Sequence, residues 1–175
     1  MRRKLGWLAV GVGSLAVAGG RDAPTFSAVF REVPGAQKVI ETPFEQLGNL
    51  SYTHRLTLQG AGPVFLTRAA LEGSETPNVI TVWVSSPHST LQQQRALVAV
   101  IKYAVARCFA PLTPPQTNML QTLAQQNWWL KLGQQEQQMD FLKISWSGKE
   151  GLKIGGHEVS GIRVEWPNNR GMCTW

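Results

Sequence analysis

Residues 79–108 read VITVWVSSPHSTLQQQRALVAVIKYAVARC, and the spacing of apolar residues changes within this stretch. Val79 to Val84 contains only β-branched residues and Trp83. Such a run is typical of a central strand that is covered on both faces, or on one face with Trp83 partly exposed. The next segment has a different period, so a strand is followed directly by a helix.

The helix begins with a polar pattern and continues with an apolar stripe. Ser89, with Gln92 three residues later, predicts a capping box. Beyond it, apolar residues recur every three or four positions as far as Cys108. This spacing predicts an amphipathic helix over about 90–110, which Pro111 ends.

A second helix is predicted immediately afterwards. Thr113 is suited to the N-cap, Pro114 to the first turn, and Gln116 to the third helical position. Its C-terminal end is expected between Gln126 and Gly133, where glycine favours termination.

The segments before these helices alternate with a period of two, as half-buried strands do. The clearest strand is expected from Ser51, with Tyr52, His54 and Leu56 on the apolar side. A turn at 60–63 separates it from a second strand over 64–71, with a helical turn over 68–71 as the alternative for its last part. A short strand is predicted earlier, over Lys38–Thr42.

Strands return at the C-terminal end. Alternating residues predict strands over 142–146, 152–154 and 159–166, with a tight turn at Gly155–Gly156 and a bulge at Ser160–Gly161. The fold class is therefore α+β with an antiparallel sheet: N-terminal strands, two consecutive amphipathic helices on one face, and a C-terminal three-stranded meander.

The N-terminal residues resemble a targeting segment rather than part of the fold. Basic residues at 2–4 precede a mostly apolar run over 5–18, which ends in Ala16-Val17-Ala18. This pattern predicts a secretory signal peptide over 1–18. The alternative is a retained membrane anchor over 5–20, although a spanning helix needs about 20 residues.

The remaining chain is long enough for one domain. Residues 19–36 contain several glycines and prolines and predict an extended lead-in, with one strand at Phe26–Val33. Residues 37–175 then form a single α+β domain. We expect it to be periplasmic or secreted, as the signal peptide implies.

The two cysteines fit an oxidising compartment. In an exported protein, Cys108 and Cys173 predict one disulfide, with two buried free thiols as the alternative. The bridge would close a loop of about 65 residues. The chain has no C-x-x-C motif and no zinc-ligand spacing, so we predict no metal and no cofactor.

Charge and motifs argue against several activities. Three of the 17 basic residues belong to the signal peptide, which leaves 14 against 11 acidic residues and lowers the net charge from +6 to +3. That weakens a nucleic-acid role inferred from basicity alone. The common nucleotide-binding, serine-hydrolase and zinc-protease motifs are missing. We therefore assign no catalytic residue and favour a protein that is not an enzyme.

Among the titratable residues, His54 is the main candidate for a functional site. The strand alternation places it with Tyr52 on the apolar side. One interpretation is a core-edge histidine bonded to backbone. The other is a pocket lined by both residues, in an exported enzyme of the hydrolase type.

The main functional hypothesis concerns an aromatic, amide-rich stretch at 125–138, QQNWWLKLGQQEQQ. Trp128 and Trp129 are adjacent, so at most one packs easily into a core. With Gln125 and Lys131 they predict a surface that binds an envelope or extracellular macromolecule. The alternative for these tryptophans is a lid over the sheet edge.

A third hypothesis is a single-stranded nucleic-acid binder. It would use exposed aromatic side chains together with a local stripe of basic groups: Arg55, Arg68, Lys131 and Lys143.

Overall fold

The computed structural model describes the chain in seven ranges: 23–46, 49–71, 76–126, 133–147, 152–154, 156–167 and 171–174. Side chains are described throughout these ranges except at 43–46 and 49–52. The predicted signal peptide and the first residues of the predicted lead-in lie outside them.

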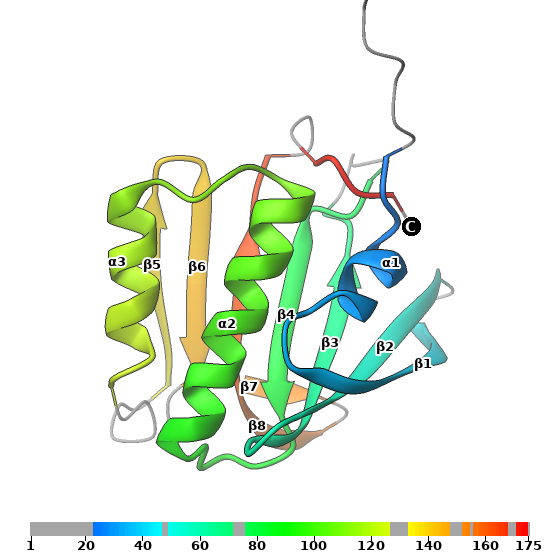
Figure 1. Cartoon of the computed structure of the whole chain (residues 1–175), viewed down its shortest axis with the longest axis horizontal. Helices are drawn as coiled ribbons and strands as arrows, with labels where there is room; N and C mark the ends of the chain where they lie inside the picture. Colours follow the sequence, from blue (N-terminus) through cyan, green and yellow to red (C-terminus); the bar gives the residue numbers. More distant parts are fainter. Residues whose placement is uncertain are drawn as a thin grey trace, which may run out of the picture.

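Within these ranges, eight strands form one antiparallel sheet and three helices lie on one of its faces (Figure 1). The strand order is β1-β2-β3-β4-β8-β6-β5, and β7 pairs with β8 outside this path. The α+β class with an antiparallel sheet is confirmed. The elements are α1 (Phe26–Arg31), β1 (Ala36–Gln46), β2 (Asn49–Leu58), β3 (Gly62–Ala69), β4 (Val79–Val84), α2 (Leu91–Cys108), α3 (Pro114–Leu123), β5 (Gln134–Met139), β6 (Leu142–Ser147), β7 (Leu152–Ile154) and β8 (His157–Glu165).

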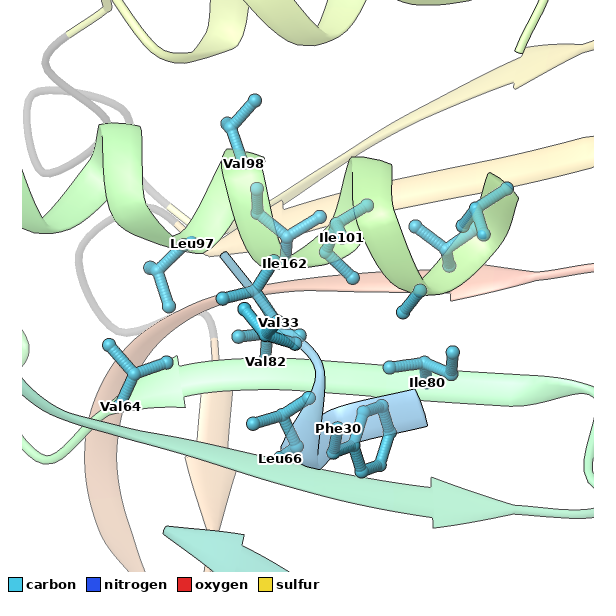
Figure 2. Packing of buried hydrophobic residues seen from close by; sticks show 14 of the residues in the cluster. Phe30, Val33, Val64, Leu66, Ile80, Val82, Leu97, Val98, Ile101 and Ile162 are labelled. Atoms are coloured by element: carbon cyan, nitrogen blue, oxygen red, sulfur yellow. The ribbon is translucent and has the colours of Figure 1, made fainter. Parts of the chain in front are cut away.

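The core lies between the sheet and the helices. Figure 2 shows Leu97 and Ile101 of α2 packed over the central strands, whose inward residues include Val82 and Ile162. All four are less than 1% exposed. The predicted central strand at Val79–Val84 is confirmed, because β4 lies between β3 and β8 with its inward face under α2.

The first helix corrects the prediction for the lead-in. The strand expected at Phe26–Val33 is wrong, because Phe26–Arg31 forms α1. Phe26, Val29 and Phe30 are buried at the three- and four-residue spacing of a helix face. Thr25 caps the helix, since its Oγ1 accepts from the Ala28 N–H at 3.2 Å.

The cap of α2 lies one residue later than predicted. Thr90, not Ser89, is the N-cap, and Gln93 completes the capping box. Ser89 is instead buried and its hydroxyl lies 2.7 Å from that of Ser160 in β8. The helix α3 begins after Thr113 as predicted, but it ends at Leu123, before the predicted range.

The C-terminal strands do not form a simple meander. The predicted strand β6 pairs with β8 rather than with β7, as in the partners Ile144 and Val164. The short β7 pairs only with the first residues of β8. Apolar alternation located these strands, but it contains no information on which partner each one selects.

The disulfide between Cys108 and Cys173 is present, with Cα atoms 4.8 Å apart. Both cysteines are buried. The tail that follows pairs with the start of the domain: the Phe26 N–H donates to Thr174 O and the Thr174 N–H to Pro24 O, both at 3.1 Å. The two ends of the domain are thus held beside the C-terminal end of α2 (Figure 1).

Candidate functional site: a buried polar cluster at the α1 side of the sheet

His54 lies on the inward face of β2 and is 1% exposed. The ring of Phe30 from α1 contacts it edge-on, with 4.9 Å between the ring centroids. The side chain of Tyr52, predicted to share a pocket with His54, lies outside the described part of the structure. The sheet places its backbone opposite Pro43 of β1.

Two polar side chains from separate elements contact His54, and Arg68 from β3 contacts both of them. The Glu41 carboxylate from β1 and the Ser27 hydroxyl from α1 each lie 3.2 Å from His54 Nε2. Ser27 also donates to Glu41 Oε1 at 2.8 Å and accepts from Arg68 Nη1 at 3.3 Å. We call these four residues, Ser27, Glu41, His54 and Arg68, the polar cluster.

Electrostatics keep His54 neutral at pH 7. Burial is the largest effect and lowers the pKa of His54 from 6.5 to about 4. The Glu41 carboxylate opposes this shift, whereas the positive charges of Arg68 and Arg31 add to it. A neutral imidazole carries one proton, and the adjacent carboxylate favours placing it on Nε2. The opposite nitrogen, Nδ1, is buried and has no hydrogen-bond partner among the described residues.

This arrangement differs from that of a serine nucleophile activated by histidine. In a catalytic triad, one imidazole nitrogen accepts the serine proton while the carboxylate binds the other. Here the same nitrogen faces both Ser27 and Glu41, and the Ser27 hydroxyl already donates to the carboxylate. The cluster therefore joins α1 to three strands and leaves Ser27 without the histidine base of a catalytic triad.

This geometry makes a direct prediction about reactivity. A fluorophosphonate probe, which labels activated serines, is expected to leave the protein unmodified at pH 7.5, because His54 is not positioned to take the Ser27 proton. Intact-mass measurement after one hour would check this. An adduct that disappears in Ser27→Ala would contradict the structural assignment.

Sequence reasoning singled out His54 but missed Ser27 and Glu41 as its partners. Arg68 was placed in a surface stripe, yet it is 4% exposed and points to the inward face. A signal was present, because Arg68 continues the inward series of Val64 and Leu66 along β3. A charged residue at such a position requires a buried partner.

The basic groups considered for nucleic acid do not form one stripe. Arg55 lies on the helix-free face, 5.9 Å from the centroid of Phe65, which stacks on Trp83 with 4.5 Å between centroids. Arg68 lies on the opposite face, and Lys143 forms an ion pair with Glu136 at 2.9 Å. Lys131 lies outside the described residues.

Trp128 and Trp129 also lie outside the described residues, so the predicted surface is seen only at its two ends. Gln125 is exposed just beyond α3. The other end, Gln134–Met139, forms β5, a strand that was not predicted. It lies at one edge of the sheet, and most of its side chains are exposed.

Comparisons of the chain with protein-family models, with curated proteins and with solved structures gave no match. Within the described ranges, no helix combines the length and apolar character needed to cross a membrane, and no three His, Cys, Asp or Glu side chains gather as metal ligands would.

Proposed function

We propose that the protein is an exported, non-enzymatic binding domain, which holds an extended segment of an envelope or extracellular partner against β5. The observation that carries this proposal is the character of β5 as an edge strand. An exposed edge offers a row of backbone donors and acceptors to a strand from another chain. Among the described strands, β5 pairs only with β6.

The backbone groups available on β5 follow from its hairpin with β6. The loop contains two residues, Asp140 and Phe141, and Met139 pairs with Leu142. In such a hairpin the closing pair exchanges both backbone hydrogen bonds, and hydrogen-bonded and non-hydrogen-bonded pairs then alternate. The residues that direct N–H and C=O away from β6 are therefore Gln138, Glu136 and Gln134.

Within β5 itself, proline, lysine and bulges are absent, whereas the strand at the opposite edge of the sheet has all three. Natural edges are blocked by proline, lysine, bulges or covering elements. Strand β1 has Lys38, Pro43 and a register shift between Ala36 and Lys38. Strand β5 has no proline, and its charged residue, Glu136, is neutralised by Lys143.

Side chains along β5 suit a polar, extended partner. The four glutamines of β5 can each donate and accept hydrogen bonds beside a docked backbone. Gln125 lies at the other end of the same sequence stretch, and we propose that Trp128, Trp129 and Lys131 extend the contact as aromatic and basic anchors. The buried disulfide supports export, because such bonds persist in oxidising compartments.

A photo-crosslinking experiment tests this binding site. p-Benzoylphenylalanine at Gln137, an exposed position of β5, is expected to form an adduct with a partner when exported protein is irradiated in intact cells. Glu136→Pro removes an outward N–H without touching the β6 pairing and is expected to reduce the adduct at least fivefold, because each lost backbone bond costs about 1 kcal/mol and the ring also blocks approach.

Two controls separate strand pairing from other effects. Glu136→Ala removes the same ion pair but keeps the N–H, so the adduct should persist. The probe at Ile40, which is 40% exposed on the protected edge β1, should give little adduct. An adduct that survives Glu136→Pro, or no adduct from Gln137, would contradict the proposal. A self-adduct would mean that β5 pairs copies of this chain.

A further inference from the structure

The polar cluster joins the N-terminal helix to the sheet through one imidazole. α1 has only six residues, so its own backbone hydrogen bonds cannot keep it folded in isolation. Its position depends on Phe26, Val29 and Phe30 in the core and on the Ser27 contacts with Glu41 and His54. The hydrogen bonds of the Ser27 side chain all depend on the protonation states of its partners in the polar cluster.

A second proton on His54 would enter an unfavourable environment. Nδ1 is buried, and no hydrogen-bond acceptor among the described residues faces it. The ionisable groups that act on the ring are Glu41 from β1, Arg68 from β3 and Arg31 from α1. Glu41 already accepts from Ser27 and lies 3.9 Å from Arg68 Nη2, so two positive charges oppose protonation and one shared carboxylate favours it.

We propose that the polar cluster is an acid-sensitive latch, in which protonation of His54 releases α1 from the sheet. Opening hydrates the imidazolium and exposes the aromatic ring of Phe30, which is buried in the closed form. The start of α1 remains attached, because Phe26 N–H bonds to Thr174 in the tail that the disulfide tethers. The release is therefore a local opening rather than unfolding of the domain.

Linkage fixes the direction and size of the effect. The pKa of His54 is about 4 when α1 is closed and close to its ordinary value of 6.5 when the ring is in water. The open form therefore binds more protons between these values, and closure weakens as the pH falls from 6.5 toward 4. Between pH 7 and pH 5 the opening equilibrium should increase about 20-fold.

Hydrogen–deuterium exchange on the disulfide-bonded protein tests the latch. Labelling times at pH 7, 6 and 5 are scaled to the intrinsic exchange rate, so that protection alone is compared. Peptides from α1 are expected to lose about 20-fold protection between pH 7 and pH 5. Peptides from α3, which does not contact the polar cluster, serve as the internal reference and should change less than twofold.

Two variants distinguish the latch from general acid sensitivity. His54→Gln retains an amide that can bond Glu41 but does not titrate, so protection of α1 should become independent of pH. Arg31→Gln removes one opposing positive charge at an exposed position but keeps the titrating imidazole, so it is the matched control and should retain most of the pH effect between pH 7 and pH 5.

Three outcomes would overturn the latch. One is pH-independent protection of α1 in the wild-type protein. Another is an unchanged pH effect in His54→Gln. The third is equal protection of α1 and α2 at every pH, which would mean that α1 opens only when the whole domain unfolds.

Discussion

Replacement of both Cys108 and Cys173 with alanine is expected to lower the free energy of unfolding by about 4 kcal/mol. The disulfide spans 65 residues of sequence, and in the chain-entropy model a loop of this length restricts the unfolded chain by about that amount. The free energy of unfolding of a typical domain is about 5–15 kcal/mol, so the double variant would lose a large share of its stability.

Loss of the disulfide should also weaken contacts that lie away from the sulfur atoms. The tail pairs with Pro24 and Phe26, so its release removes two backbone hydrogen bonds at the start of α1. Urea denaturation followed by circular dichroism measures the total effect. Met172→Ala, at a 45% exposed position beside Cys173, controls for loss of side-chain contacts in the tail. A loss below about 1 kcal/mol in the double variant would contradict the argument.

Much of the fold follows from local patterns in the sequence. The helix α2, the strand β4 and the alternation of β2 are each set by residues close together in the chain, and each was predicted within a few positions. The disulfide was predicted because two cysteines, in a chain expected to be exported, allow a single pairing. These features need no knowledge of which elements become neighbours in space.

The features that were missed depend on contacts distant in sequence. β5 contains four glutamines and no apolar alternation, and it is a strand because β6 forms a hairpin with it. The pairing of β6 with β8 was also not predicted, because it joins strands that are not consecutive in the chain. The polar cluster brings Ser27 to Arg68, 41 residues away, and only the assembled sheet makes that contact.

Phe30→Ala is expected to lower the free energy of unfolding by about 3–5 kcal/mol, the usual cost of deleting a fully buried phenylalanine ring. Phe30 is less than 1% exposed and contacts both Phe26 and His54. An extended lead-in outside the domain, as first predicted for residues 19–36, would instead lose almost nothing. Urea denaturation at pH 7 distinguishes the two cases.

Phe141→Ala is the matched control, because it deletes the same ring from the β5–β6 turn, where Phe141 is 51% exposed. Its expected cost is below about 1 kcal/mol. If the two variants lost similar stability, α1 would not be part of the core, and the latch would lose its physical basis because Ser27 and Phe30 would not be held against His54. If only Phe30→Ala is destabilising, α1 supplies part of the energy that closes the latch. That variant should then show less protection of α1 already at pH 7, with the pH dependence from His54 preserved.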